Sequence, residues 1–121
     1  MRDHKKLKAF ELADNLALQI YRETAAFPPV EQFSLTSQLR RAGVSVASNI
    51  VEGCARNTEK DYLHFLDTAY GSAKEVEYQL SLARRLGYFQ TTELEENAAE
   101  TARVLNGLIN SLRRKTIDFR R

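Results

Sequence analysis

The stretch that decides the fold runs from residue 35 to residue 53 and reads LTSQLRRAGVSVASNIVEG. As a helix with about 100° between successive residues, it has one apolar face made of Leu35, Leu39, Ala42, Val46, Ile50 and Gly53. A second apolar set continues that face around the cylinder and consists of Gly43, Val44, Ala47 and Val51. Together they cover roughly half the circumference, more than the ~100° stripe that a surface helix needs. We therefore expect two apolar neighbours, the core of the chain and something else.

The second apolar set is the candidate contact with another copy of the chain. A glycine inside a helix, such as Gly43, costs about 1 kcal/mol relative to alanine. Two explanations stay open: Gly43 permits tight packing within the bundle, or it admits a neighbouring subunit. The predicted oligomer interface comprises Arg40, Gly43, Val44, Ala47 and Val51.

A narrow polar strip occupies the rest of the same helix. Its predicted network comprises Arg41, Ser45, Ser48, Asn49 and Glu52. Arg41 and Ser45 are one turn apart, as are Ser48 and Glu52, so each pair is within hydrogen-bonding reach. The strip is either solvated surface, a ligand site, or a network with Glu75 or Glu77 that fixes the register of the packed helices.

Capping and breaking residues predict three further helices. Pro28 and Pro29 end the first helix, because proline lacks an N–H and disfavours helical geometry in the residue before it. Ser34 and Thr58 are suitable N-caps, and residues 92–95 (TELE) form a capping box. We expect one domain over residues 1–121, with helices at about 6–26, 35–56, 59–86 and 93–116. Short turns between them predict an all-α, antiparallel up-down-up-down four-helix bundle.

Apolar residues recur every three or four positions along the other helices and predict the core. The first series is Phe10, Ala13, Ala17, Ile20, Thr24 and Phe27, joined by Leu16. The series in the third helix is Tyr62, Leu66, Ala69, Ala73, Val76, Leu80 and Ala83. The fourth is Leu94, Ala98, Thr101, Leu105, Leu108 and Leu112. Gly87 is expected to end the third helix, with the ring of Tyr88 folded back onto its last turn, and residues 118–121 are expected to fray.

Composition is that of a soluble globular protein with a formal net charge of only +2. The single cysteine, Cys54, cannot form an intrachain disulfide, which fits a reducing cytosol. No apolar run approaches the ~20 residues of a membrane span. We expect a cytoplasmic protein without a membrane partner.

Basic residues gather at one end of the predicted bundle. In this topology the start of the first helix, the end of the second, the start of the third and the end of the fourth share one pole. The candidate nucleic-acid-binding residues there are Lys5, Lys6, Lys8, Arg56, Lys60, Arg113, Arg114 and Lys115, and Arg2, Arg120 and Arg121 belong to the same pole. They suit a phosphate backbone, with charge and shape in place of base reading. Alternatively, they only complement helix dipoles and keep the chain soluble.

Catalytic and metal-binding patterns have little support. His64 lies three residues from both Asp61 and Asp67, a spacing that is more often a solvated helix face than a metal site. Cys54 has no histidine partner at a suitable spacing, so a packed, inert thiol is expected. We find no Gly-rich phosphate loop, nucleophile elbow or paired-cysteine zinc pattern. The sequence predicts no enzyme, no cofactor and no metal.

Short motifs in the second helix resemble a known family. They are Gln38-Leu39-Arg40-Arg41-Ala42, Val44-Ser45-Val46, Ser48-Asn49-Ile50 and Glu52-Gly53. They resemble the signature of the four-helix-bundle proteins encoded in intervening sequences of bacterial 23S ribosomal RNA genes. The flanking Lys60-Asp61-Tyr62 and Leu86-Gly87-Tyr88 agree with it. The chain departs from the pattern in having Gly43 where Ala is usual, Ala47 where Pro is frequent and Val51 where Ala is frequent.

The resemblance implies a bundle assembled as a ring-shaped homopentamer. The architecture is also similar to that of the accessory proteins of diversity-generating retroelements, basic pentameric barrels that work with a reverse transcriptase and nucleic acid. No biochemical activity comes with the family itself. We therefore expect a non-enzymatic binding or scaffold protein whose partners are its own copies and RNA or DNA. The alternative is a structural or protein-interaction ring that contacts no nucleic acid.

Overall fold

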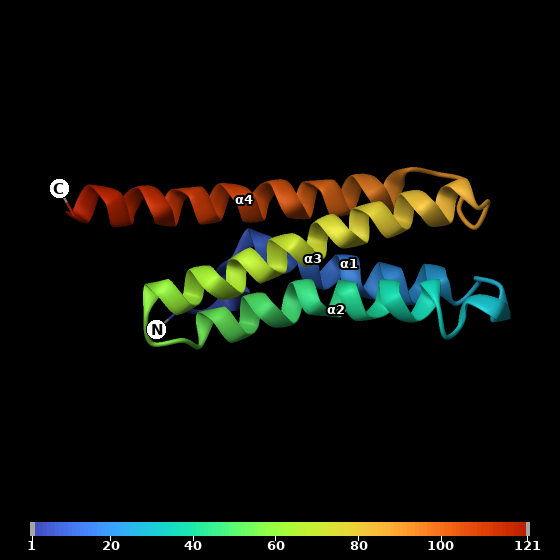
Figure 1. The fold of residues 1–121 in the computed structure, drawn as a ribbon, viewed down its shortest axis with the longest axis horizontal. Helices are drawn as coiled ribbons and strands as arrows, with labels where there is room; N and C mark the ends of the chain where they lie inside the picture. The colour runs from blue at the N-terminus through green and yellow to red at the C-terminus, as the bar shows by residue number, and fades with distance from the viewer. Residues whose placement is uncertain (1, 121) are drawn as a thin grey trace.

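The computed structural model describes residues 2–120, with side chains through Lys115. Within that range the chain is all-helical and contains no strand. Two 3₁₀ turns, η1 (His4–Lys6) and η2 (Pro29–Glu31), accompany four α-helices: α1 (Lys8–Thr24), α2 (Leu35–Cys54), α3 (Glu59–Arg85) and α4 (Glu93–Arg120). Figure 1 shows them lying lengthwise beside one another.

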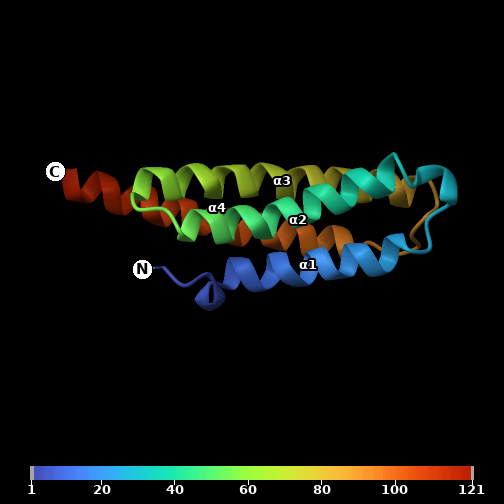
Figure 2. The ribbon, with the colours of Figure 1, turned by 90° about the horizontal axis from the view of Figure 1, so that it is seen from below.

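Each helix packs against two neighbours. Helix α2 contacts α1 and α3, while α4 contacts α3 and α1. Figures 1 and 2 agree that the N-terminal segment lies near the turn between α2 and α3, and that α4 extends past this end of the bundle. The four helices therefore enclose one core, with the N-terminal segment and the α2–α3 turn at the same end.

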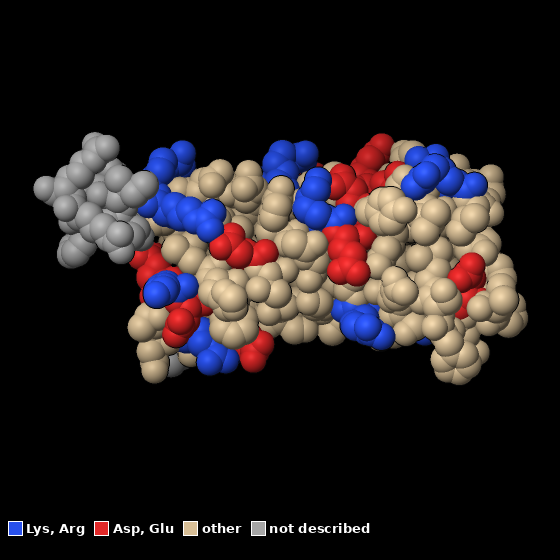
Figure 3. Space-filling model, viewed as in Figure 1, with Lys and Arg blue, Asp and Glu red and all other residues tan. Residues whose placement is uncertain are grey.

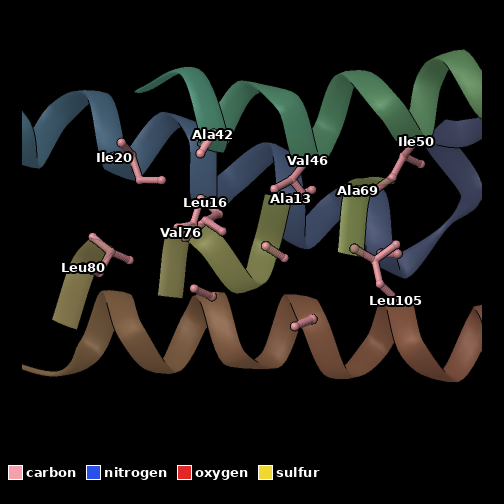
Figure 4. Close-up of a cluster of buried hydrophobic side chains, with 14 of the residues drawn as sticks. Ala13, Leu16, Ile20, Ala42, Val46, Ile50, Ala69, Val76, Leu80 and Leu105 are labelled. Atoms are coloured by element: carbon pink, nitrogen blue, oxygen red, sulfur yellow. The ribbon is translucent and has the colours of Figure 1, made fainter. Parts of the chain in front are cut away.

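The core is built from one side of every helix, as Figure 4 shows. The largest fully buried side chains include Leu16, Ile20, Leu39, Ile50, Leu66, Leu80 and Leu105. The first apolar face predicted for residues 35–53 is buried in full, as is the predicted series of α3. Burial of these faces supplies the main driving force for folding.

The predicted core positions of α1 and α4 need small corrections. In α1, Ala9 is buried, whereas Phe10 and Ala17 are only partly buried. In α4, Ile109 is buried, whereas Leu108 and Leu112 are only partly covered. A straight helix has 3.6 residues per turn, so a strict seven-residue repeat drifts away from the core along α4.

Helix boundaries also differ from the predicted ones by a few residues. Helix α1 begins at Lys8, because η1 precedes it and Leu7 occupies the N-cap position in an extended conformation. It ends at Thr24 and α2 ends at Cys54, each two residues early. Helix α4 continues through Arg120, beyond the predicted end at residue 116.

Capping contacts separate accurate from inaccurate local predictions. The hydroxyl of Thr58 accepts a hydrogen bond from the backbone N–H of Asp61 at 3.1 Å, as predicted. Ser34 occupies the N-cap position of α2 but its side chain makes no capping bond. The Glu31 carboxylate instead accepts from the N–H of Leu35 at 3.4 Å.

The turn between α3 and α4 matches the expected glycine stop. Gly87 has φ of 89°, the left-handed conformation that favours glycine. The N–H of Tyr88 donates to the carbonyl of Ala83 at 3.0 Å, which closes a Schellman motif. The ring of Tyr88 packs against Phe27, with 5.0 Å between centroids, and its predicted contact with the last turn of α3 stays a prediction.

The predicted capping box at the start of α4 is wrong for its acidic residue, Glu95. Glu95 binds Arg84 of α3 in place of reaching back to the helix start. Thr92 instead donates its hydroxyl to the carboxylate of Glu96 at 3.0 Å. A guanidinium on the neighbouring helix is a stronger partner for a carboxylate than a backbone N–H.

Candidate nucleic-acid interface

Contacts between distant parts of the chain gather the basic residues at one end. Arg2 donates to the carbonyl of Arg56 at 2.9 Å, which joins the N-terminal segment to the end of α2. Arg113 of α4 pairs with Asp67 of α3 at 2.6 Å. We call this end the basic pole, and its predicted residues all have exposed side chains: Lys5, Lys6, Lys8, Arg56, Lys60, Arg113, Arg114 and Lys115. The side chains of Arg120 and Arg121 lie outside the described residues.

Acidic side chains neutralise part of the basic pole. Ion pairs join Lys8 to Glu11 at 3.8 Å and Arg56 to Glu52 at 3.5 Å, in addition to Arg113 with Asp67. Figure 3 accordingly shows red atoms among the blue ones at the end that carries the N-terminus. Among the described residues, no ion pair is formed by Lys5, Lys6, Lys60, Arg114 and Lys115. These side chains remain available to an anionic partner.

Two buried groups beneath the pole are held in their neutral forms. Cys54 and Tyr62 are almost fully buried where α2 and α3 meet. Burial raises the pKa of the Cys54 thiol and raises the pKa of Tyr62 to about 12. The thiolate is the reactive form of cysteine, so this environment fits a packed thiol better than a nucleophile.

The residues predicted for an oligomer interface do not all lie on the surface. Val44 and Val51 keep 43% and 38% of their surface exposed, and Ala47 is partly buried. Gly43 is buried within the bundle, where an added Cβ would lie 2.8 Å from the terminal methyl group of Ile20. Its placement matches tight internal packing and removes it from the surface open to a second copy.

Arg40 lies between α2 and α1 at the edge of this surface. Its Nε donates to the hydroxyl of Thr24 at 2.9 Å, and Nη2 donates to the carbonyl of Tyr21 at 3.3 Å. The guanidinium carbon lies 4.6 Å from the centroid of the Tyr21 ring. Arg40 therefore connects two helices of the same chain.

The predicted polar strip divides into two parts. The hydroxyls of Ser45 and Ser72 are 2.9 Å apart, and Asn49 donates to the carbonyl of Ser45 at 2.8 Å. Among the described residues, Ser48 and Glu52 do not form the expected hydrogen bond with each other. The Ser48 hydroxyl donates to the carbonyl of Val44, and Glu52 pairs with Arg56. The network thus links α2 to α3 through serine hydroxyls.

Arg41 does not form the hydrogen bond predicted with Ser45. Among the described residues its side chain has no hydrogen-bond or ion-pair partner, and it borders a groove of about 350 Å³. The groove is lined by Phe33, Ser37, Gln38, Arg41, Ala42, Ser45, Ser72 and Glu75. Glu75 accepts a bond from Gln79 at 3.0 Å, whereas Glu77 pairs with Lys74. Glu75 therefore faces the strip as one of the two predicted carboxylates.

The residues considered for metal binding have other contacts. Asp67 pairs with Arg113, and the ring of His64 packs edge-on against Phe65 at 5.6 Å. In the part of the chain that the structure describes, no three metal-ligating side chains cluster together. Within the same part, every helix is too short or too polar to cross a membrane.

Rings at the pole were not recognised as functional from the sequence. Tyr62 was predicted only as a core position and Phe65 was given no role, yet both rings contact arginine side chains. An aromatic residue near an arginine in the sequence is a weak signal, and Arg2 and Tyr62 are distant along the chain. Only the folded structure brings them together.

Comparisons with known proteins agree on the fold. Residues 5–110 match a family model described as 23S rRNA-intervening sequence protein. The chain is also similar to a solved protein of unknown function from the S23 ribosomal protein family of Bacteroides thetaiotaomicron. That comparison has a TM-score of 0.76 at 23% identity and covers 84% of this chain and 95% of the other. No curated protein matches the chain. Neither description assigns a catalytic activity.

Proposed function

Because the chain belongs to the 23S rRNA-intervening sequence protein family, we propose that it is a non-enzymatic, cytoplasmic binding or scaffold protein. In this proposal an antiparallel up-down-up-down bundle assembles into a ring of identical copies, five in number by family resemblance. The ring contacts RNA or DNA through its basic poles. The observation that carries the proposal is a set of exposed basic side chains that form no ion pair with any described residue: Lys5, Lys6, Lys60, Arg114 and Lys115.

The oligomer part of the proposal rests on the outer face of α2. Val44 and Val51 lie two turns apart and are both exposed, although both are β-branched apolar residues. Tyr21 of the neighbouring α1 is also 47% exposed. Covering such side chains with a second copy would remove their apolar surface from water.

Substituting Val44 with glutamate tests this assembly. We expect the Val44→Glu protein to lose the oligomer and keep its helical content, since the side chain is exposed in the single chain. Val30→Glu is the matched control, because Val30 is 81% exposed and belongs to η2, outside the exposed face of α2. Ultracentrifugation gives the mass, and a wild-type particle of 13.8 kDa at high concentration would contradict the proposal.

The nucleic-acid part rests on charge rather than base reading. A ring repeats the basic pole around its axis, so that modest charge on each copy becomes a continuous basic rim. Lysine and arginine that neutralise phosphates release counterions, which makes binding fall steeply with salt. Contacts of this kind position a nucleic acid without specifying its sequence.

A salt titration with an RNA and a DNA oligonucleotide tests this part. We expect retardation at low salt, with affinity falling linearly in log–log form as salt rises. Lys60→Glu reverses a charge in the first turn of α3, where an acid suits the helix dipole and the fold is retained. Arg22→Glu makes the same charge change in the last turn of α1 and should leave binding near the wild-type value.

A protein-interaction ring without nucleic acid is the second candidate. The ion pairs of Lys8, Arg56 and Arg113 favour it, because each acid lowers the positive potential of the pole. Exposed pairs are worth little and are screened by salt. The salt titration separates the two candidates. If the protein does not retard the oligonucleotides at low salt, or binds them with an affinity independent of salt, the protein-interaction ring is supported and the nucleic-acid-binding ring is rejected.

A further inference from the structure

Two arginine side chains at the basic pole lie against aromatic rings. The guanidinium carbon of Arg2 is 4.1 Å from the centroid of the Tyr62 ring. That of Arg56 is 4.7 Å from the centroid of the Phe65 ring. Cation–π contact holds a guanidinium over a ring, so each of these two head groups has an aromatic partner within the chain.

The two arginines border one hollow. It has a volume of about 610 Å³ and is lined by Arg2, Cys54, Ala55, Arg56 and Asn57. Arg2 spans it by donating from Nη1 to the carbonyl of Arg56 at 2.9 Å. The wall beneath is closely packed, because Cys54 and Tyr62 are buried between α2 and α3.

We propose that this hollow is a phosphate site that holds one backbone phosphate of a bound nucleic acid. The inference rests on the proposed function and adds its anchoring residues. A guanidinium is a planar fork whose N–H groups match phosphate oxygens, whereas a lysine acts as a point charge. Ring contact fixes the fork before the ligand arrives, which lowers the entropic cost of binding.

The acid that competes for the Arg56 guanidinium beside the hollow is weakly held. Glu52 lies 3.5 Å from Nη2 of Arg56, and both side chains are about half exposed. Exposed pairs of this length contribute little. A phosphate that enters the hollow meets two guanidiniums and the Asn57 amide, so it replaces one weak contact with several stronger ones.

Binding of a single-stranded RNA oligonucleotide at low salt tests the site by fluorescence anisotropy. We expect Arg56→Ala and Arg2→Ala each to weaken binding about tenfold, the loss typical of an ordered charged contact. Lys6→Ala removes the same charge from the same pole and should weaken binding only about twofold while lowering the salt slope by about one. Arg56→Lys keeps the charge and should not restore the lost affinity, because it lacks the fork.

The decisive variant changes no charge. Phe65→Leu removes the ring beneath Arg56 and should weaken binding about threefold, because the guanidinium is no longer held in place. Phe89→Leu is the matched control, since it removes a ring of the same type far from the pole. Circular dichroism of both variants confirms that they are folded before they are compared.

The outcomes separate this inference from the proposed function. If the wild-type protein binds no oligonucleotide, both are rejected. If it binds with the expected salt dependence but Arg56→Ala matches Lys6→Ala and Phe65→Leu matches Phe89→Leu, the inference alone is overturned. Displacement of the oligonucleotide by sub-millimolar inorganic phosphate at constant ionic strength would assign the hollow to a free phosphate and also overturn it.

Discussion

The two ends of the bundle use aromatic rings in different ways. At the distal end, which comprises Phe27, Glu31, Arg84, Tyr88, Phe89 and Glu95, rings pack on one another. The centroid of Phe27 lies 5.0 Å from that of Tyr88 and 5.1 Å from that of Phe89. At the basic pole, guanidiniums lie over the rings of Tyr62 and Phe65, and Phe65 also packs edge-on against His64.

Polar groups follow the same division. The hydroxyl of Tyr88 donates to Glu31 at 2.7 Å, and Arg84 pairs with Glu95, so the distal end satisfies its own groups and joins its two turns. At the basic pole several cations have no acidic partner in the part of the chain that the structure describes. The difference indicates that the distal end closes the fold, whereas the pole keeps groups available for a partner.

Removing the central ring of the distal end should have the largest effect. Phe27 is 8% exposed and touches both neighbouring rings. We expect Phe27→Ala to lower the free energy of unfolding by about 3 kcal/mol, the value typical of a buried phenylalanine. Urea denaturation at fixed protein concentration measures it, because oligomers unfold in a concentration-dependent way.

Phe33→Ala is the control for that change. The Phe33 ring is 90% exposed, so its loss should alter stability by less than about 0.5 kcal/mol. The folded Phe27→Ala protein should still bind nucleic acid like the wild type. Equal losses of stability in the two variants would show that the distal cluster does not hold the fold together.

A smaller effect is expected from the caps that begin α2 and α3. Thr58→Ala removes the side-chain bond to Asp61 at the pole and should cost about 1 kcal/mol of stability. Ser34→Ala changes the equivalent position of α2, where the hydroxyl makes no capping bond, and should cost much less. Thermal unfolding of both variants gives the comparison, and a larger loss for Ser34→Ala would contradict the observed cap geometry.

The fold was predictable because local signals agree with one another. Helix α3 shows this best: its apolar series is buried in full, Thr58 caps its start and Gly87 ends it. The errors in the predicted helix caps occur where a long polar side chain can bind either a local or a distant partner. Glu95 selects Arg84 on another helix, and Glu31 replaces Ser34 at the start of α2.

The site was less predictable than the fold. Charge along the sequence identifies which basic residues share a pole, but not which of them are neutralised by neighbouring acids. Likewise, a heptad repeat identifies Tyr62 as a core residue and cannot reveal that Arg2 covers its ring. Gly43 shows the same limit, because the space that it leaves is filled by Ile20 of a different helix. Such contacts depend on tertiary packing.

The smallest predicted effect concerns the pH dependence of stability. It arises from the ionisation of Tyr62 at the basic pole, which differs in its cause from that of Tyr88 at the distal end. Burial raises the pKa of Tyr62 to about 12, whereas the hydrogen bond to Glu31 is the main cause of the raised pKa of Tyr88. In the unfolded chain a tyrosine ionises at about pH 10. The contribution of Tyr62 to stability is therefore complete below that pH and is lost as the pH rises toward 12.

Tyr62→Phe should remove this part of the alkaline loss of stability. Between pH 10 and 12 the wild-type protein should lose a few tenths of a kcal/mol per pH unit more than the variant, below the limit of about 1.4 for one proton. Tyr78→Phe changes an exposed tyrosine and should decline like the wild type. Urea midpoints across this range measure the difference. Parallel curves for wild type and Tyr62→Phe would mean that the ring beneath Arg2 is hydrated, and that the pole lacks the closely packed wall that distinguishes it from a solvated helix end.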